Sequence, residues 1–343
     1  MTISFKPKQV TKRLLTALPA RAKEVITGRY GLDDNAKKQT LESIGKKYGI
    51  TRERVRQIEA YSLSLIRKSE VYEQEGPTFK ELHNFVKSKG GLMKTQELLN
   101  SLSTDKSTQN HFSFLLALGD GFYHHKEDDE LHHHWHVDKD LAKNIQNSLK
   151  KVYNDLSDDE IVPEAKLIDK FLTYCKDVNE EYKDAEILKR WLSMSKLIGK
   201  NPLGEWGKID SSNVSTKSVR DYAYLVIRQH GSPIHFKEVA KKISEVFGKK
   251  AHVATTHNEL IKDKRFVLVG RGLYALREWG YASGVVRDVI ANVIRKYGKM
   301  TKEEIVKQVL KERFVKENTV LINLQNSRHF SKDKDGKYSI KGE

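Results

Sequence analysis

Residues 40–67, TLESIGKKYGITRERVRQIEAYSLSLIR, constrain the fold more than any other stretch, because they have the layout of two short helices joined by a tight turn. Thr40 can cap a first helix, and Gly49 can take the left-handed backbone that ends it. Thr51 can then cap a second helix by accepting a hydrogen bond from an otherwise unpaired amide. The apolar residues of the first helix are Leu41, Ile44 and Tyr48. The sequence therefore predicts a helix-turn-helix.

The second helix of this motif has two different faces, since successive residues turn by about 100° around the axis. The face expected to pack on a small core carries Val55, Ile58, Ser62 and Leu65. The outward face carries Arg52, Glu53, Arg56 and Gln57. Guanidinium, carboxylate and amide groups read base edges in the major groove, and Arg54 lies to the side, where a backbone phosphate would be. The alternative, a solvated and salt-bridged surface helix, is disfavoured by the capped turn before it.

Two stretches of the N-terminal part, LPARAKEVITGRYGLDD (residues 18–34) and TLESIGKKYGITRERVRQIEA (residues 40–60), closely resemble region 4 of the housekeeping bacterial sigma factors. The resemblance covers about the first fifth of the chain. It implies a module that reads the promoter −35 element in double-stranded DNA and binds the flap of the RNA polymerase β subunit. In that family, promoter-melting and −10-reading regions precede region 4, whereas here only a short leader does. We therefore do not expect this chain to open a promoter alone.

Carried over position by position, the resemblance makes Arg52, Glu53 and Gln57 the base-reading residues. The contacts to DNA phosphates are assigned to Thr51, Arg54 and Arg56. It also places Leu18, Val25 and Tyr30 in the core of the module, near the side that faces the flap.

Composition supports a polyanionic partner and several domains. The 343 residues are too many for one small core, and their net charge is +16. Residues 1–70 alone hold 16 basic and 7 acidic side chains, a net of +9. A single cysteine, Cys175, excludes an internal disulfide, and we expect it to pack in a helix without a chemical role. No apolar run is long enough to cross a membrane. We therefore expect a cytoplasmic protein associated with the nucleoid.

The rest of the chain repeats one plan, which is helix, strand, helix, helix and hairpin, the order of a winged helix-turn-helix. The clearest copy lies between about residues 217 and 281, and the last copy repeats it at a constant offset. Positions matching at that offset are Leu260 with Leu324, Phe266 with Phe330, Gly272 with Gly336 and Tyr274 with Tyr338. Gly76-Pro77 breaks the helical pattern and is interpreted as a linker.

These patterns predict a mainly α fold with small β-hairpins, in which a sigma region 4-like helix-turn-helix is followed by tandem winged-helix repeats. The expected domains are 1–71 for the helix-turn-helix module, then winged helices 76–138, 139–212, 213–281 and 284–343. The second repeat has the faintest pattern: residues 160–172 would form its second helix, residues 187–199 its third helix and residues 203–209 its return strand.

One repeat carries a second resemblance. SPIHFKEVAKKI (residues 232–243) and RFVLVGRGLYALREWGY (residues 265–281) are similar to the HARE helix-turn-helix family. Members of that family occur in chromatin regulators, in restriction systems and in the δ subunit of some bacterial RNA polymerases. The resemblance implies binding to nucleic acid or docking on protein, and it does not decide between them. Cationic groups on the later third helices are modest: His252, His257, Lys262, Lys316 and Arg328.

Other clusters favour structural roles. The histidines between residues 124 and 136 would share a hairpin, but they lack the fixed ligand spacing of a structural zinc site, so we expect a polar or phosphate-contacting wing and no metal. Asp158 to Lys166 falls within one helix entry, unlike a nuclease metal site. Trp135, Trp191, Trp206 and Trp279 are expected in cores rather than stacked on bases. No catalytic elbow and no phosphate-binding glycine loop is present, so we expect no enzyme, no cofactor and no small-molecule substrate.

The leading hypothesis is a sequence-specific DNA-binding bacterial transcription factor. Its sigma-like head would read a −35-like element, dock on the RNA polymerase β flap, or do both, and its winged-helix tail would add contacts to DNA or polymerase. One alternative is a δ-like interaction protein that binds polymerase without reading DNA sequence. Another is the specificity subunit of a restriction or defence system.

Overall fold

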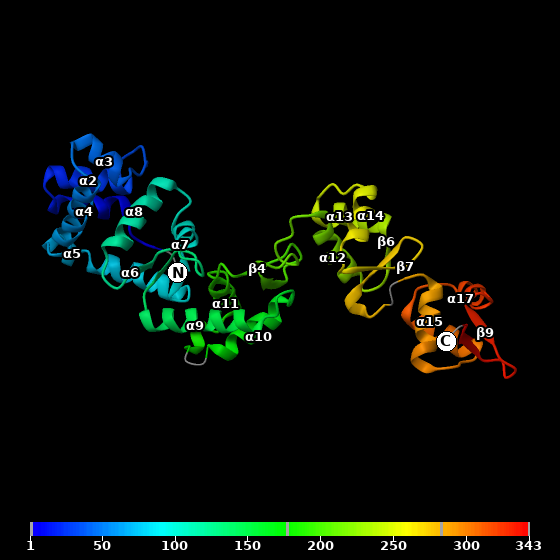
Figure 1. Ribbon diagram of the computed structural model, residues 1–343. Helices are drawn as coiled ribbons and strands as arrows, with labels where there is room; N and C mark the ends of the chain where they lie inside the picture. Colours follow the sequence, from blue (N-terminus) through cyan, green and yellow to red (C-terminus); the bar gives the residue numbers. More distant parts are fainter. Residues whose placement is uncertain (1–2, 176–177, 282–283, 342–343) are drawn as a thin grey trace. The chain divides into compact units, whose positions relative to one another are not determined.

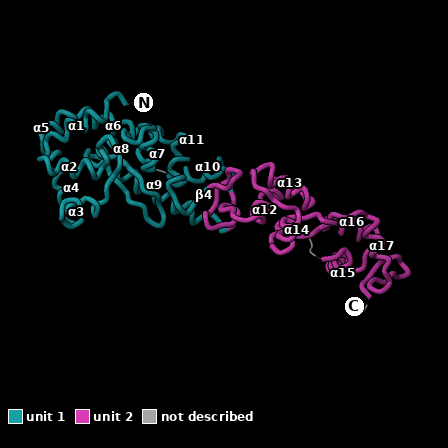
Figure 2. The backbone as a smooth tube through the Cα atoms, turned by 90° about the horizontal axis from the view of Figure 1, so that it is seen from above, with its two compact units in different colours: residues 1–158, 162–199 teal, residues 159–161, 200–343 magenta. Residues whose placement is uncertain are grey.

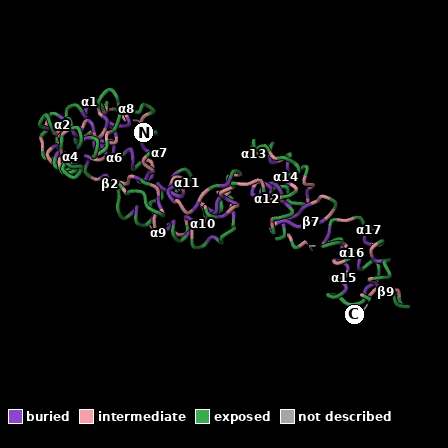
Figure 3. Tube along the Cα trace, turned by 45° about the horizontal axis from the view of Figure 1, so that its top comes forward, coloured by how far each residue is buried: buried purple, intermediate pink, exposed green. Residues whose placement is uncertain are grey.

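The computed structural model describes residues 3–175, 178–281 and 284–341. The chain forms two compact units, residues 1–158 with 162–199 and residues 159–161 with 200–343 (Figure 2). Helices provide most of the regular structure, and the strands are short and pair in sheets of two or three (Figure 1). Along most helices buried and exposed stretches alternate, as amphipathic packing requires (Figure 3). The predicted mainly α fold with small hairpins is confirmed, whereas the five-domain division stays a prediction.

The first residues fold as a bundle of short helices. They are α1 (Pro7–Leu14), the 3-10 turn η1 (Leu15–Ala17), α2 (Ala20–Tyr30), α3 (Leu41–Tyr48) and α4 (Arg52–Arg67). Thr40 Oγ1 accepts from the amide of Ser43 at 3.1 Å, and Thr51 Oγ1 accepts from the amide of Arg54 at 3.2 Å. Gly49 has a φ of +64° at the end of α3. Both predicted caps and the predicted turn are therefore present.

The expected linker at Gly76-Pro77 is wrong. A short helix, α5 (Glu70–Gln74), leads almost directly into α6 (Gly76–Ser88), whose first turn holds Pro77. Proline is tolerated there because the amide it lacks has no partner within the helix in any case. Glu75, between the two helices, is buried and accepts from Arg13 Nε and Thr78 Oγ1. The break in the sequence pattern thus marks a helix start.

The next segment has the order expected of a winged helix. After α6 come β1 (Leu92–Lys94), α7 (Thr95–Leu102), α8 (Lys106–Leu118), β2 (Tyr123–His125) and β3 (His134–His136). The strands form one antiparallel sheet in the order β1-β3-β2, with Met93 and His124 both opposite Trp135.

One hydrophobic core joins this winged helix to the N-terminal bundle. It includes Leu14 and Ile26 from the bundle together with Phe112, Phe114 and Leu115 from α8. Polar contacts cross the same boundary: Arg67 donates to the carbonyls of residues 117 and 118 at 2.9 and 2.8 Å, and Asn110 Nδ2 donates to the carbonyls of residues 31 and 36 at 3.0 and 2.9 Å. The helix-turn-helix is therefore packed on α8 and does not stand alone.

The segment with the faintest repeat pattern is largely helical. It contains α9 (Lys139–Asp155), α10 (Glu164–Tyr174), the turn η2 (Glu180–Tyr182), α11 (Ala185–Leu192) and the paired strands β4 (Ile198–Lys200) and β5 (Trp206–Lys208). The helix expected over residues 187–199 is shorter than predicted, because it ends at Leu192. Residues beyond it pair instead with the hairpin before α9: the amide of His132 donates to the carbonyl of Met194 at 2.9 Å, and the amide of Lys196 donates to that of Glu130 at 2.7 Å.

The two clearest repeats have the expected element order. One has α12 (Val219–His230), β6 (Ile234–His235), α13 (Phe236–Phe247), α14 (Val253–Lys262), β7 (Phe266–Gly270), β8 (Leu273–Leu276) and η3 (Arg277–Trp279), and the other has α15 (Val286–Tyr297), α16 (Lys302–Glu312), α17 (Glu317–Leu324), β9 (Phe330–Lys332) and β10 (Tyr338–Ile340). Each has its own core. The residues matched by offset occupy the same places, since Phe266 and Phe330 both begin the first strand of a hairpin.

Candidate nucleic-acid interface

Helix α4 presents a charged face to solvent while its opposite side anchors it. Val55 is fully buried and packs with Val25 and Ile44 in the small core of the helix-turn-helix. The predicted contact residues Thr51, Arg52, Glu53, Arg54, Arg56 and Gln57 are all exposed. The outward display of these side chains follows the spacing argued from the sequence. Their division into base-reading and phosphate-binding residues stays a prediction.

Several of these exposed side chains are paired with one another. Glu53 and Arg56 form an ion pair with Nη2 to Oε1 at 2.7 Å and Nε to Oε2 at 2.9 Å. The hydrogen bond with Arg56 is the main reason that the pKa of Glu53 is lowered, and the same bond raises the pKa of Arg56. Arg54 Nη1 donates to Gln57 Oε1 at 3.1 Å. Arg52 forms no hydrogen bond or ion pair through its side chain among the described residues.

The pairing of Arg54 with Gln57 revises the geometry expected from the sequence. The spacing argument places Arg54 to one side of the reading face, yet it lies within hydrogen-bond distance of Gln57, three residues along the same helix. Residues three apart are neighbours on a helix surface. A partner that uses either side chain therefore has to break this contact or accommodate both groups together.

Gly45, a residue that sequence reasoning missed, sets the approach of α3 to the turn. It is buried inside α3, and a Cβ built on it would lie 2.6 Å from the carbonyl oxygen of Ile50. The amide of Ile50 donates to the carbonyl of Gly45 at 3.0 Å, which fixes the turn that starts α4. A glycine inside a helix is unfavourable by up to about 1 kcal/mol, so its presence there is the sequence signal of a close backbone approach.

The side of the head that the sigma resemblance assigns to the polymerase flap is covered within the chain. Leu18 is buried and Tyr30 half-buried against the core shared with α8, whereas Val25 belongs to the small core under α4. The ring of Tyr30 meets that of Phe114 edge-on, with centroids 5.4 Å apart. Burial is the main reason that the pKa of Tyr30 is raised, with Glu59 contributing in the same direction.

The histidine-rich hairpin is partly buried rather than a free wing. His134 is fully buried, its Nδ1–H donates to the carbonyl of His132 at 2.9 Å, and its Nε2 has no hydrogen-bond partner. Its ring stacks on His125 with centroids 4.7 Å apart. Burial lowers the pKa of His134 to about 4, so the ring is neutral near pH 7. Within the described residues, no three side chains of His, Cys, Asp or Glu converge as metal ligands would.

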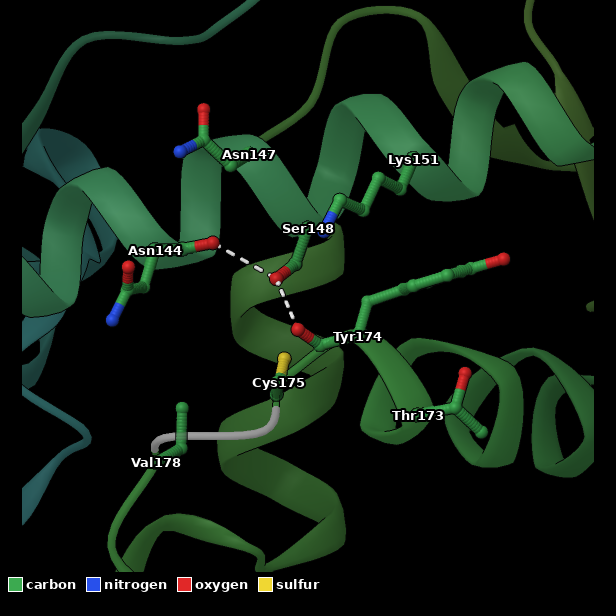
Figure 4. Close-up of a pocket in the computed structure, with 8 residues that line it drawn as sticks. All are labelled: Asn144, Asn147, Ser148, Lys151, Thr173, Tyr174, Cys175 and Val178. Atoms are coloured by element: carbon green, nitrogen blue, oxygen red, sulfur yellow. Dashed lines mark hydrogen bonds between the residues drawn. The ribbon is translucent and has the colours of Figure 1, made fainter.

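Other residues considered from the sequence lie where packing explains them. Trp191 and Trp206 are buried, and Trp191 Nε1 donates to the carbonyl of Gly90 at 3.2 Å. Cys175 lies in the wall of a 560 Å³ pocket near Ser148, whose hydroxyl contacts the carbonyls of Asn144 and Tyr174 (Figure 4). Burial raises the pKa of the Cys175 thiol, which disfavours the reactive thiolate.

His257, named from the sequence as a cationic group on α14, packs instead of facing outward. Its ring stacks on Phe236 with centroids 4.2 Å apart and meets Tyr274 edge-on. This position makes His257 part of the support for α14 rather than a contact to a ligand.

Comparisons with known proteins match two parts of the chain. Residues 14–68 match the family model of Sigma-70, region 4. Residues 217–279 match the HARE-HTH model, whose description names a restriction endonuclease HTH domain. Neither model describes an enzyme domain. In the part of the chain that the structure describes, no helix combines the length and apolar character needed to cross a bilayer.

Three curated relatives match over short stretches. The RNA polymerase sigma factor RpoS of Coxiella burnetii is 44% identical over 73 residues, which are 21% of this chain and 20% of RpoS. SigA of Clostridium acetobutylicum is 43% identical over 60 residues (18% and 16%), and RpoD of Neisseria gonorrhoeae is 44% identical over 59 residues (17% and 9%). The chain thus spans a fifth or less of these relatives. It combines a segment of the Sigma-70 region 4 type with a segment of the HARE-HTH type.

Proposed function

We propose that this chain is a bacterial transcription factor that binds double-stranded DNA in a sequence-specific way through α4. The observation that carries the proposal is the exposed face of α4 in a segment similar to Sigma-70 region 4. The caps, the turn at Gly49 and the close approach at Gly45 hold this helix by its apolar side. We assign no catalytic role, and this function would place the protein on the nucleoid in the cytoplasm.

The proposed mechanism begins with electrostatic capture and ends with readout in the major groove. The net charge of +9 over residues 1–70 attracts the phosphate backbone and accounts for the sequence-independent part of the affinity. Arg52, Glu53 and Gln57 then read base edges, and Thr51, Arg54 and Arg56 contact phosphates. Because Glu53 holds Arg56 and Arg54 holds Gln57 in the free protein, both pairs have to rearrange when the helix enters the groove.

Docking on RNA polymerase, and on its β flap in particular, is the second part of the proposal. It is supported by the relatives that are named as RNA polymerase sigma factors. The side assigned to the flap is packed on α8, so docking there requires the contact between Tyr30 and Phe114 to open. We therefore propose that DNA binding does not depend on polymerase, and that the winged-helix segments supply additional contacts to DNA or polymerase.

Selection of duplexes from a random library by the full chain, followed by affinity measurements at moderate salt, tests the DNA-binding role. We expect Arg52→Ala and Gln57→Ala to relax sequence preference and Arg54→Ala to weaken binding to all sequences about equally. Lys68→Ala, at the far end of the same helix, is the matched control and should change little. If all three variants bind selected DNA as the unmodified chain does, α4 is not the reading element.

An interaction role without DNA reading is the second candidate, and the mutual pairing of the α4 side chains favours it. Co-purification with polymerase, combined with no measurable affinity for duplex DNA, would support that role. A specificity subunit of a restriction or defence system is a third candidate, and it rests on the match of residues 217–279. Genome-wide crosslinking separates the first two: peaks at a fixed distance upstream of transcription starts support promoter reading, and peaks spread through genes support polymerase docking.

A further inference from the structure

A second basic site lies outside α4, in the segment that contains α12 and α14. A pocket of 640 Å³ is formed where the loop before α12 meets the turn between α14 and β7. Four exposed cationic side chains line it: Lys217, Arg220, Lys262 and Lys264. None of the four forms a hydrogen bond or an ion pair through its side chain with another described residue.

The acidic residues at this pocket are already neutralised by a fifth cation, Arg265. Its Nη2 donates to Asp221 Oδ1 at 3.0 Å and to Asp263 Oδ2 at 2.6 Å, and its Nε also contacts Asp263. Burial is the largest influence on both carboxyl groups and acts to raise their pKa. The hydrogen bonds, from Ser218 and Arg265 to Asp221 and from Arg265 to Asp263, together outweigh it and lower the pKa. These two carboxylates therefore leave the four exposed cations uncompensated.

The same guanidinium makes the pocket a fixed structure. Arg265 Nη1 donates to Ser212 Oγ at 2.9 Å and to Asn213 Oδ1 at 3.0 Å, which ties the start of β7 to the loop before α12. Asp221 also closes the capping box at the start of α12, where it accepts from the amide and hydroxyl of Ser218. The helix end is thus satisfied internally, and attraction for a ligand comes from the side-chain cations.

From this geometry we infer that the pocket binds backbone phosphates of nucleic acid and gives the chain a DNA contact separate from α4. Four cations stand against one remaining carboxylate in the lining, that of Asp210. A nucleic-acid strand presents phosphates at regular short intervals, so adjacent cations can each neutralise one. Backbone contacts hold a protein in register on DNA without reading sequence. The inference rests on the proposed DNA-binding function and adds to it a contact that tolerates any sequence.

The test compares two double variants of the full chain that each remove two exposed positive charges. Lys217→Ala/Arg220→Ala changes the pocket, and Lys302→Ala/Lys307→Ala on α16 is the control. Both are measured against a labelled duplex of random sequence, about 20 base pairs long, over a salt series. We expect the pocket variant to bind at least about fivefold more weakly, with a salt dependence shallower by about two phosphate contacts. The control should stay within about twofold.

The same pair is repeated in a chain that also carries Arg52→Ala, Arg54→Ala and Gln57→Ala. This step separates the two proposals. Loss of sequence preference in the triple variant concerns α4, whereas a further loss from the pocket variant concerns the pocket. If the pocket variant and its control behave alike in both backgrounds, the inference is overturned even when α4 reads DNA.

Competition experiments identify the source of the phosphate. Inorganic phosphate and poly-glutamate are added at matched ionic strength. We expect a single strand of about 20 nucleotides to compete for the part of the affinity that depends on the pocket, and both other anions to compete weakly. Strong competition by inorganic phosphate would assign the pocket to a free anion, and strong competition by poly-glutamate would assign it to an acidic protein. Either result would overturn the nucleic-acid assignment.

Discussion

Arg54 Nη1 donates to Gln57 Oε1 at 3.1 Å on the exposed side of α4, so a residue expected to contact phosphate is coupled to one expected to read a base. The coupling predicts that Gln57→Glu is more harmful than Gln57→Ala. A carboxylate at this position would form an ion pair with Arg54 and would also repel phosphate. We expect Gln57→Glu to lower affinity for all duplexes by about tenfold, and Gln57→Ala mainly to relax sequence preference.

Affinity measurements on selected and scrambled duplexes check this prediction. Gln229→Glu, on the exposed C-terminal part of α12, makes the same charge change away from α4 and serves as the control. Equal effects of Gln57→Glu and Gln57→Ala would show that Arg54 acts independently of Gln57.

The ion pair between Glu53 and Arg56 predicts a gain of non-specific binding when the acid is removed. Glu53→Gln frees the Arg56 guanidinium, which is held at 2.7 Å in the free protein, for a phosphate. We expect tighter binding to random-sequence duplex and a salt dependence steeper by about one phosphate contact, together with weaker discrimination at the base that Glu53 contacts. Glu186→Gln breaks a comparable i,i+3 pair with Lys189 on α11 and should leave the salt dependence unchanged.

The shared core predicts that the helix-turn-helix and α8 unfold together. Phe114 is fully buried and contacts Tyr30, so Phe114→Ala leaves a cavity in that core. The expected loss is about 3–5 kcal/mol of unfolding free energy. Denaturant unfolding followed by amide signals from α2 and α8 should show both helices shifting to the same lower midpoint. Phe330→Ala, in the core of the last repeat, should leave those signals in place. Separate midpoints for α2 and α8 would contradict the shared core.

Buried His134 predicts that stability falls in mild acid. The pKa of this histidine is about 4 in the folded state and about 6.5 when unfolded, because burial disfavours the imidazolium. The unfolded state therefore binds the proton more tightly, and the stabilisation present above pH 6.5 is lost as the pH falls toward 4. The loss is at most on the order of 3 kcal/mol. The pKa values of His124, His132 and His136 are also lowered, mainly by burial, and these residues add to the trend.

Unfolding measurements between about pH 7 and pH 4 test the role of His134. His134→Asn can keep a donor for the carbonyl of His132 but cannot take up a proton, so it should flatten the pH profile. His230→Asn, on the exposed end of α12, should leave the profile unchanged. A profile as steep in His134→Asn as in the unmodified chain would exclude His134 as its main cause.

Local features could be predicted from the sequence, because they depend on neighbouring residues. The caps at Thr40 and Thr51, the turn at Gly49 and the outward face of α4 follow from residue type and spacing. The constant offset between Phe266 and Phe330 also correctly predicted equivalent hairpin positions.

Contacts between residues far apart in sequence were not predictable in the same way. Nothing in the periodicity of α8 shows that Phe114 packs on Tyr30, because an apolar face does not name its partner. The pairing of residues 130–132 with 194–196 ended a helix that local propensity would have continued. Pro77 was ambiguous, since proline is found both in linkers and in the first turn of a helix. Arg265 gave no signal at all, because its partners come from three separate segments.

The close approach at Gly45 predicts that position 45 controls the orientation of α4. In Gly45→Ala the new methyl group would lie 2.6 Å from the carbonyl oxygen of Ile50, so the turn has to move. Overpacking of this kind costs about 1–3 kcal/mol, partly offset by the better helix propensity of alanine. Since Ile50 directly precedes the cap of α4, we expect a loss of DNA affinity of about tenfold or more even where the protein stays folded.

Gly49→Ala is the matched control for this prediction. Its φ of +64° makes alanine strained by about 1–2 kcal/mol, but a Cβ there meets no atom within 4 Å. Both variants should therefore lose stability to a similar degree, while only Gly45→Ala displaces the turn. Affinity measured at a temperature where both are folded separates displacement from strain. If the two variants bind DNA equally well, the packing of Gly45 against Ile50 does not set the position of α4.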